Sequence, residues 1–549
     1  NNIAIGMDAL NANTTGTGNV AVGYASLDAN TTGEFQVAVG KNTLGSNTTG
    51  GNNTAIGDNA LLANTTASNN TAVGYATLTA NTTGTSNVAM GALALDANTT
   101  GNSNTAVGES ALTNNVTGER NTAIGRESLK NTTSSENTAV GNEALKLNSS
   151  GANNTAIGSF SLNVNTTGFD NIAVGKGALD ANTTGFRNIG IGVDAAGAIT
   201  TASGNTAVGW NSLLVNTTGA SNSAFGEKSL IDNTTGENNV AVGSSALENN
   251  TTASNNTAVG FQTLLANTTG TANTAVGTLA LNANSTASYN TAVGYQALED
   301  NTTGANNVAV GYVALNANTA SNNTAVGYLA LLANTTGTRN TALSGGALQN
   351  NTTASFNTAI GYQALNANTT GASNVAIGDQ AGKAITTSGG CVFIGQESGL
   401  STTGQQNTFV GEDSGWQVTT GSKNTIIGRY NGNQDGLDIR TASNRIVVSD
   451  GDGNIGMYID GSQDAHFDGD VIAYSTTISD RRLKDDIKNI TDALDKVDQI
   501  NGVTFVRKNN GQASAGVIAQ EIMEVLPEAV KDKSMPLHTG PEDPYYGVE

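Results

Sequence analysis

The sequence predicts a protein that is all-β over most of its length: an elongated parallel β-solenoid, or β-roll, followed by a small α+β domain. A motif close to Asn-Thr-Ala-Val-Gly returns in 26 copies between Ile3 and Gly428, at twenty-two intervals of 17 residues and three of 16. Such a strict period indicates one unit stacked many times, here about 26 coils of 17 residues. No proline precedes Pro527, as expected of continuous hydrogen-bonded ladders.

Each repeat is predicted to form two short strands and a turn. In the copy at residues 70–84, residues 71–73 read Thr-Ala-Val, the alternation expected of a strand, and Gly74 ends it. A second short strand is predicted around Leu78, before turn residues that read Asn-Thr-Thr-Gly. Stacking aligns the leucines in one apolar column and the valines and isoleucines in another. With ~4.8 Å per coil, the stack makes a rod of roughly 120 Å.

The first strand of the repeat is apolar on both faces, with valine or isoleucine on one and an almost constant alanine on the other. Strands with this pattern are usually covered on both sides. A solenoid this thin encloses a single interior, so its second face needs another chain. We therefore expect an intertwined homotrimer, or a similar bundle of copies about a long axis.

The repeat resembles the head of Yersinia-type trimeric autotransporter adhesins, whose coils carry a similar Val-Ala-Ile-Gly strand. The resemblance covers residues 1–428 in style, although the adhesin coils are shorter than 17 residues. It implies a trimeric β-roll for this part of the chain.

The composition argues against several partners. Asp and Glu number 44 and Lys and Arg 23, so the net charge is -21, and such a surface repels both nucleic acid and anionic membranes. No run of 18 apolar residues is present, so no membrane insertion is predicted. The only cysteine is Cys391, which excludes an intrachain disulfide. The sequence begins at Asn1 in mid-repeat, so we expect an N-terminal attachment region upstream of it.

Residues 429–478 are predicted to form a β-rich stem or connector. The period stops after Gly428, and short apolar segments alternate with polar turns. Strands are predicted at residues 445–448, 456–459 and 471–474. The stem would join the solenoid shaft, residues 1–428, to a domain of different character.

That domain, residues 479–549, is predicted to be α+β. It opens with Ser-Asp-Arg-Arg-Leu-Lys at residues 479–484 and carries Gly-Val-Ile-Ala-Gln-Glu at residues 516–521. Its predicted elements are a helix with an apolar face formed by Ile490, Leu494, Val497 and Ile500, strands at 503–506 and 516–519, and a helix at 520–526.

The two motifs match, in order and spacing, the endosialidase-type intramolecular chaperone found at the C-terminus of many phage tail fibres and tailspikes. The resemblance implies a module that trimerises, guides the β-rich fibre into register and then cuts itself off. It assigns Ser479 as the nucleophile, Lys484 as the general base and Ile478–Ser479 as the scissile bond. A lysine that loses its proton can activate a serine hydroxyl. Family members continue beyond a Tyr-Gly-Val-Glu-like stretch, so we expect this domain to be C-terminally truncated at Glu549.

The alternative for Ser479 is a helix N-cap, with Asp480 favourable in the first turn. Five residues along one helix rotate by about 500°, which leaves Ser479 and Lys484 on different faces. For catalysis, Ser479 therefore has to precede the helix, or Lys484 has to act on a neighbouring protomer. No cofactor and no metal site are predicted.

Other patterns have ordinary structural explanations. The segment 450–454 has the first spacings of a calcium loop, but Ile455 and Gly461 stand where glycine and glutamate belong, so a hairpin turn is predicted. The Asn-Thr-Thr triplets fit the N-glycosylation pattern but are interpreted as turn residues. Their threonines lie in the predicted turns, which argues against ice binding, because ice-binding solenoids carry flat threonine arrays on strands. A final pattern is a predicted aromatic column formed by Tyr295, Tyr312 and Tyr328. We favour mutual stacking of these rings over sugar binding.

These features predict a phage tail fibre: a trimeric shaft in the virion, joined to tail or baseplate proteins, that contacts a host cell-surface receptor such as a carbohydrate. The alternative is a bacterial trimeric cell-surface adhesin that carries the same chaperone module. A depolymerase spike ranks last, because it needs a cleft with paired acidic residues and the coils are uniform. Enzymatic activity is limited to self-cleavage by the Ser479 and Lys484 pair.

Overall fold

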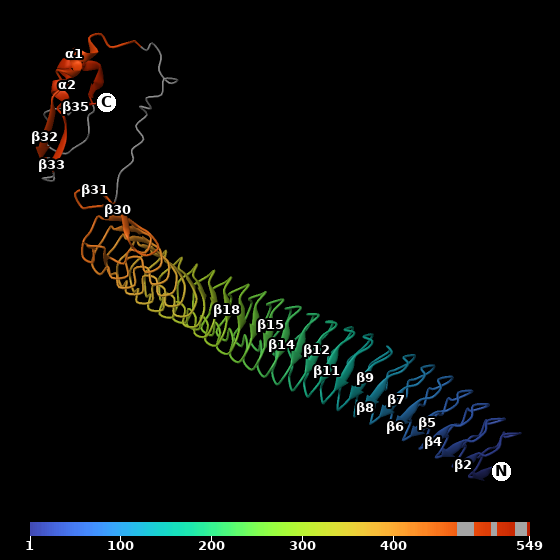
Figure 1. Ribbon diagram of the computed structural model, residues 1–549. Coiled ribbons are helices and arrows are strands. Elements are labelled where there is room, and N and C mark those ends of the chain that lie inside the picture. The colour runs from blue at the N-terminus through green and yellow to red at the C-terminus, as the bar shows by residue number, and fades with distance from the viewer. Residues whose placement is uncertain (469–487, 507–512, 533–545, 549) are drawn as a thin grey trace. The chain divides into compact units, whose positions relative to one another are not determined.

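The computed structural model describes residues 1–468, 488–506, 513–532 and 546–548. Its contacts divide the chain into two units, Asn1–Gly469 and Asp470–Glu549. In the first unit, 26 three-residue strands stack in parallel, each in register with the strand one repeat later, which gives a long rod of coils (Figure 1). The predicted β-solenoid is confirmed. We number each coil after its strand.

The strands of the rod share one length and one spacing. They are β1 (Ile3–Ile5), β2 (Val20–Val22), β3 (Val37–Val39), β4 (Thr54–Ile56), β5 (Thr71–Val73), β6 (Val88–Met90), β7 (Thr105–Val107), β8 (Thr122–Ile124), β9 (Thr138–Val140), β10 (Thr155–Ile157), β11 (Ile172–Val174), β12 (Ile189–Ile191), β13 (Thr206–Val208), β14 (Ser223–Phe225), β15 (Val240–Val242), β16 (Thr257–Val259), β17 (Thr274–Val276), β18 (Thr291–Val293), β19 (Val308–Val310), β20 (Thr324–Val326), β21 (Thr341–Leu343), β22 (Thr358–Ile360), β23 (Val375–Ile377), β24 (Val392–Ile394), β25 (Thr408–Val410) and β26 (Thr425–Ile427).

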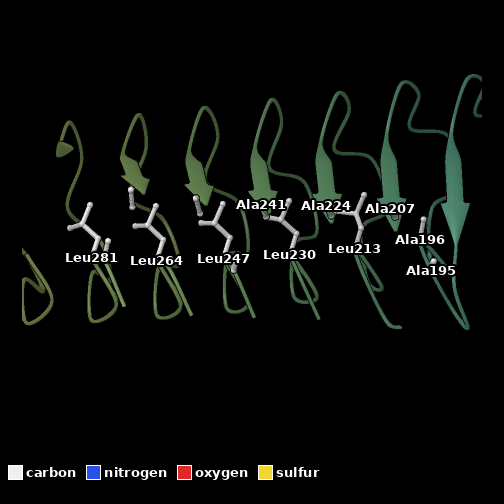
Figure 2. Close-up of a cluster of buried hydrophobic side chains, with 14 of the residues drawn as sticks. Ala195, Ala196, Ala207, Leu213, Ala224, Leu230, Ala241, Leu247, Leu264 and Leu281 are labelled. Carbon is white, nitrogen blue, oxygen red and sulfur yellow. The ribbon is translucent and has the colours of Figure 1, made fainter. Parts of the chain in front are cut away.

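The core of the rod is a pair of apolar columns that run along its interior. The middle residue is buried in every strand from β2 to β26 and is alanine in most coils, as Ala241 is in β15. A leucine seven residues after the strand begins, such as Leu247, packs inside the same coil and is fully buried. Figure 2 shows the leucines in one row below the strand alanines. The valines and isoleucines at the strand ends lie outside this core and remain partly exposed.

The predicted second strand around Leu78 is wrong. In residues 1–428, all of which the structure describes, each coil has one strand, and the leucine lies in a turn. Leu78 has φ 53°, its N–H donates to Ala94 O of the next coil (3.0 Å), and its carbonyl accepts from Asn81 N (3.2 Å). The left-handed conformation costs roughly 1–2 kcal/mol for a side chain with a Cβ. Burying a leucine returns about 1.5–3 kcal/mol, so the turn persists coil after coil.

Glycine follows every strand of the rod except β21, because the next coil lies too close for a side chain at low cost. At Gly74, φ is 139°, and an added Cβ would lie 2.7 Å from Gly91 O. A residue with a Cβ would be strained by this backbone conformation and would clash with the next coil. This explains why the motif ends in glycine in nearly every copy.

Two ladders of buried asparagines run along the rod beside the apolar core. In the first, the asparagine of the turn donates to the coil before it: Asn81 Nδ2 contacts Asn64 Oδ1 (3.0 Å) and also Gly84 O (3.0 Å). In the second, the asparagine before the strand accepts through its side chain, as Asn53 Oδ1 does from Asn70 N (3.0 Å). Most of these amides are fully buried and hydrogen bonded, so most Asn-Thr-Thr triplets of the folded rod present no accessible asparagine for glycosylation; Asn13 and Asn131 are the partly exposed exceptions.

The turn ladder is interrupted at four points, and each interruption leaves one buried carbonyl without a partner. Within residues 1–428, the unpaired ladder acceptors are Asn115, Asn182, Asn301 and Asn368. The next coil offers Thr132, Ile199 or Ile385 in three of these cases. In the fourth, Asn318 follows but turns its Nδ2 to Ala320 O (2.7 Å). The ladder is therefore a series of separate runs.

The three 16-residue coils all omit the same residue. In an ordinary coil, the turn asparagine donates to a carbonyl three residues later, as Asn250 does to Ala253 O, and an exposed threonine lies between them. In coil 19 the same bond spans two residues, from Asn318 to Ala320. Coils 8 and 24 close the turn in the same way, since Ser134 O and Gly404 O accept from positions 13 residues earlier instead of 14. The missing residue is the second, exposed threonine of the turn.

The core changes composition near the end of the rod. Phenylalanine replaces the strand alanine at Phe393 and Phe409, and glycine replaces the leucine in the same coils. A Cβ at Gly399 would lie 2.5 Å from Phe393 Cδ1, and one at Gly415 would lie 2.5 Å from Phe409 Cδ2. The aromatic rings therefore occupy the space that leucine fills elsewhere. Core volume is preserved by an exchange of large and small positions.

The sheet continues past the last regular coil. Strand β29 (Ile446–Ser449) pairs in parallel with β26, and β30 (Ile455–Ile459) and β31 (Ala465–Phe467) follow as an antiparallel meander. A small hairpin of β27 (Asn433–Gln434) and β28 (Leu437–Asp438) precedes them. The predicted strands near 445–448 and 456–459 are confirmed within one residue, and the one at 471–474 lies outside the described residues.

The second unit contains short α and β elements. They are α1 (Ala493–Val497), β32 (Gly502–Val506), β33 (Ala513–Val517), α2 (Ala519–Val525), a 3-10 turn at Pro527–Ala529, β34 (Val530–Asp532) and β35 (Tyr546–Val548). Strands β32 and β33 pair antiparallel, as do β34 and β35. The predicted first helix is shorter than expected, because Ile490 and Ile500 both lie outside α1. Helix α2 lies one residue from its predicted position.

An ion-pair network links coils 8 and 9, and Glu127 lies at its centre. Its carboxylate contacts Lys130 Nζ (2.9 Å) and Lys146 Nζ (2.6 Å), and Lys146 also contacts Glu143 (3.2 Å). The hydrogen bond from Lys146, followed by that from Lys130, lowers the pKa of Glu127 from 4.5 to about 2. The network ties adjacent coils together through side chains as well as backbone.

We expect Glu127→Gln to lower the free energy of unfolding by about 1 kcal/mol at pH 7, since the pair is only partly buried. The folded pKa is depressed, so the contribution is present above pH 4.5 and is lost as the pH falls toward 2. Thermal unfolding of both proteins at pH 7 and pH 2.5 tests this. The difference between them should shrink at the lower pH, and an equal difference at both would contradict the assignment.

Candidate functional site

The predicted cleavage site lies outside the described residues. Ser479, Lys484 and the Ile478–Ser479 bond fall within residues 469–487. The second motif, residues 516–521, lies where the structure describes the chain. It spans the end of β33 and the first turn of α2, with Ile518 in an extended conformation between them (φ -88°, ψ 122°). The motif therefore forms a strand-to-helix corner.

The described part of the second unit leaves many apolar side chains exposed. Leu494 is 84% exposed, and Val497 and Val506 are 63% and 64% exposed. Within the described residues of this unit, the buried apolar residues are Ile522 and Val530. The residues of this unit that the structure describes do not by themselves bury the core that a stable isolated domain needs. Its apolar side chains are available for contacts with other chains.

The rod carries a continuous apolar stripe on its outer strand face. The third residue of the strand is apolar in all 26 coils, and we call this column the outer stripe. Its members are partly exposed in the single chain: Ile427 is 50% exposed and Phe225 is 41% exposed. If each of the 26 side chains buried only about 30 Å², the stripe would provide the ~800 Å² per partner of a standard protein interface. Long stripes of this kind mark association surfaces.

An aromatic column lies beyond the glycine that ends each strand. The rings of Tyr295 and Tyr312 are stacked with centroids 5.5 Å apart and planes 14° apart, and Tyr312 stacks on Tyr328 at 5.5 Å and 15°. The predicted column is confirmed. Phe169 and Phe186 form a second, shorter stack at 5.0 Å. These stacks are the main concentrations of exposed rings on the rod.

The calcium-like segment is a hairpin turn, as predicted. Asp450 Oδ1 accepts the N–H groups of Asp452 (3.0 Å) and Asn454 (2.9 Å), and its Oδ2 accepts Asn454 Nδ2 (3.0 Å). These bonds close the turn between β29 and β30 and lower the pKa of Asp450, with the Asn454 side-chain bond as the largest cause. Both oxygens of the Asp450 carboxylate therefore accept hydrogen bonds from residues of the same turn.

Neither a metal site nor a membrane span is found in the part of the chain that the structure describes. There, no group of three or more His, Cys, Asp or Glu side chains is arranged to hold a metal ion. No helix among the same residues is long and apolar enough to cross a bilayer.

These observations define a fibrous repeat protein: one long solenoid followed by a short unit that carries the two chaperone-like motifs. Residues 479–531 match the family described as chaperone of endosialidase, which confirms the predicted resemblance for this segment. The chain is also 36% identical over 99 residues to the long tail fiber protein Gp37 of Enterobacteria phage K3, and equally to that of Enterobacteria phage T2. Each match covers 16% of this chain.

The matched part is a small fraction of those relatives. The chain spans 8% of the phage K3 protein and 7% of the phage T2 protein. No solved structure matches the chain. The comparisons thus bear on a limited segment, and the rod is described by its own structure.

Proposed function

We propose that this protein is a tail fibre of a phage, in which the solenoid is the shaft and residues 479–549 are an assembly module. The observation that carries the proposal is the family match beginning at Ser479, which comes later in the chain than a long repetitive rod and strands β29–β31. Similarity to two phage long tail fiber proteins favours a fibre over a bacterial adhesin. As a fibre, the protein would be part of the virion, joined to tail or baseplate proteins and turned toward a receptor on the host cell.

The fibre is proposed to consist of three copies of the chain. The outer stripe offers each copy a continuous apolar contact surface, and the exposed Leu494 and Val497 offer another in the second unit. Near-identical coils can pair one step out of register, because a shifted neighbour presents almost the same surface. A module that trimerises first would set the register before the coils associate. Residues 1–428 would then form the shaft, residues 429–478 the connector and residues 479–549 the module.

The module is proposed to cut itself off after assembly. Ser479 Oγ would attack the Ile478 carbonyl carbon while Lys484 takes up the hydroxyl proton. The peptide C–N bond then breaks, the proton passes to the nitrogen of Ser479, and an ester links Ile478 to the serine oxygen. Water hydrolyses this ester and releases residues 479–549. No cofactor takes part in this sequence of steps.

Expression of the full chain beside Ser479→Ala tests the module. The first protein is expected to yield two fragments on a denaturing gel, and mass spectrometry should place the cut before residue 479. Ser479→Ala should remain intact and still sediment as a trimer, because cleavage follows assembly. Lys484→Met should also remain intact. Cleavage that persists in Ser479→Ala would remove the serine from its proposed role, and a monomeric full chain would contradict the three-copy fibre.

Binding of the cleaved, fluorescently labelled fibre to a panel of bacterial strains tests host attachment. A tail fibre is expected to be retained on a small number of strains and washed from the rest. Retention on every strain, or on none, would contradict a receptor-specific fibre.

A further inference from the structure

The position after the strand-ending glycine changes character in coils 16–22. Elsewhere it is often charged, but in these seven coils it holds an aromatic row with two interruptions: Phe261, Thr278, Tyr295, Tyr312, Tyr328, Gly345 and Tyr362. The exposed fraction rises along the stacked part of the row, from 42% at Tyr295 to 49% at Tyr312 and 60% at Tyr328. Tyr328 is the most exposed because the next coil places glycine, not a ring, beside it.

Coil 21 leaves a slot in this row. Gly345 stands between Tyr328 and Tyr362, and a Cβ built on Gly345 would lie 3.6 Å from Tyr362 Cδ2 and 3.8 Å from Tyr328 O. Two steps of 5.5 Å give about 11 Å between ring centres two coils apart in this row. Aromatic rings pack with centroids 4.5–7 Å apart, so one additional ring fits between them at the spacing of the row.

The backbone of coil 21 departs from the repeat at the same place. Ser344 occupies the position that glycine holds at the end of most strands, with φ 109°, the most extreme positive φ of any non-glycine residue in the described chain. Strained residues of this kind concentrate at binding sites. Two carboxamides lie beside Gly346, where Asn366 Nδ2 donates to Gly346 O (2.9 Å) and to Gln349 Oε1 (3.1 Å). Ring walls are thus combined with hydroxyl and amide groups.

The surroundings of the slot are almost free of charge. Residues 249–378 contain three charged residues, Glu299, Asp300 and Arg339, of the 67 in the chain (44 acidic and 23 basic). Nucleic acid bases also stack on aromatic rings, but their phosphates need a basic groove. Arg339, the one cation of this stretch, already lies over the Phe356 ring, 5.3 Å from its centroid. The slot therefore suits a neutral ring.

We propose that the slot between Tyr328 and Tyr362 binds one neutral sugar ring of a bacterial surface polysaccharide. A pyranose ring presents C–H faces and a rim of hydroxyl groups. The faces would stack on the two tyrosines, and the rim would hydrogen bond to Ser344 and the neighbouring carboxamides. The assignment rests on the proposed attachment function and names the receptor class and the contact surface. The row belongs to the segment after the glycine turn, so it is distinct from the outer stripe.

Three variants of the full protein test the slot. Gly345→Tyr extends the row and fills the slot; Gly345 has no positive φ, so a side chain is tolerated there. Tyr328→Ala removes one wall. The matched control is Tyr24→Ala, which removes an equally placed tyrosine, 49% exposed, whose neighbours in the row are Met7 and Lys41.

The probe is an array of neutral and acidic oligosaccharides from bacterial surface polysaccharides. The unaltered protein should bind neutral members, Gly345→Tyr and Tyr328→Ala should bind at least tenfold more weakly, and Tyr24→Ala should bind as the parent does. Unchanged binding by Gly345→Tyr, or binding to acidic members alone, overturns the proposal. Retention on bacterial strains without binding to a neutral sugar overturns the slot and leaves the attachment function standing. Failure to bind both strains and sugars overturns both.

Discussion

Asn250→Leu is expected to destabilise coils 14–16 by about 2–4 kcal/mol, because it removes three buried hydrogen bonds and leaves one buried acceptor unpaired. Asn250 Nδ2 donates to Asn233 Oδ1 (2.8 Å) and Ala253 O (3.0 Å), and its own Oδ1 accepts from Asn267 Nδ2 (2.9 Å). Leucine leaves Asn233 Oδ1 without a partner, whereas Ala253 O still accepts from Asn239 Nδ2 (2.8 Å) and Asn267 Nδ2 still donates to Gly270 O (3.0 Å). Each buried polar group left unpaired costs about 1–3 kcal/mol.

Hydrogen exchange of the backbone amides measures the effect locally. Protection should fall in coils 14–16 and stay unchanged several coils away, since each coil contacts only its neighbours. Thr252→Ala is the control: it alters the same turn, but the threonine is exposed. Equal protection in the two variants would show that the ladder contributes little to stability. The natural interruptions at Ile199 and Ile385 show that single breaks are tolerated, so the variant is expected to fold.

Gly399→Leu is expected to disrupt coils 23–25 by about 3 kcal/mol or more, through overpacking of the core. Leucine itself is compatible with the backbone, since Gly399 has φ 64° and leucines elsewhere in the column adopt about the same angle. The obstacle is Phe393, whose ring atoms Cδ1 and Cε1 would both lie 2.5 Å from the new Cβ. Phe393 is fully buried, so its ring has no solvent-exposed space to enter.

A double-mutant cycle separates this clash from a general intolerance of the site. Phe393→Ala alone should cost about 3–5 kcal/mol by leaving a cavity. The double variant Phe393→Ala with Gly399→Leu restores the alanine and leucine pair of the other coils, and it should be more stable than either single variant. Urea unfolding followed by tryptophan fluorescence gives the three values, with Trp210 replaced by phenylalanine in all variants so that Trp416, in the adjacent coil, is the reporter. Additive effects would mean that the two positions do not share one space.

The sequence predicts the strands of the rod almost residue by residue. The tripeptides with alanine at the centre recur at a fixed interval, and each lies in β1 to β26 as expected. The tyrosine column also follows from spacing alone, because equivalent residues of a stacked repeat must be neighbours. The outer stripe can be read in the same way, since apolar residues on both faces of a strand leave one face for another chain.

The second strand fails because its signal is ambiguous. Thr77, Leu78 and Thr79 alternate polar and apolar residues as a strand does, and a leucine with positive φ is too rare to expect. The sequence predicts the ladder asparagines as turn residues, because asparagine is common in turns and its amide does not by itself indicate a buried ladder. A useful signal was available: where the turn asparagine is lost, Ile199 and Ile385 replace it, and isoleucine suits an interior position, not an exposed turn.

The candidate site is predictable only in part. The chaperone motifs are recognisable because they are short, ordered and correctly spaced. The slot at Gly345 is not predictable from the sequence. Tyr362 is separated from the tyrosine column by one repeat, and only the structure shows that its ring borders the position of Gly345. The change of core composition in coil 24 can be predicted from the sequence, because phenylalanine (Phe393) stands where other coils have alanine and glycine (Gly399) where they have leucine.

The shortened coils point to the one corner of the rod where the length of the chain is free to change. Coils 8, 19 and 24 each drop an exposed threonine there while both asparagine positions and the strand keep their places. A deletion at this corner does not shift the interior, and by the same geometry neither does an insertion. Loops grafted between Thr252 and Ala253, or at the equivalent corner of other coils, would therefore be displayed in a line at intervals of one coil. For protein engineering, the rod therefore offers evenly spaced insertion sites, one in each coil.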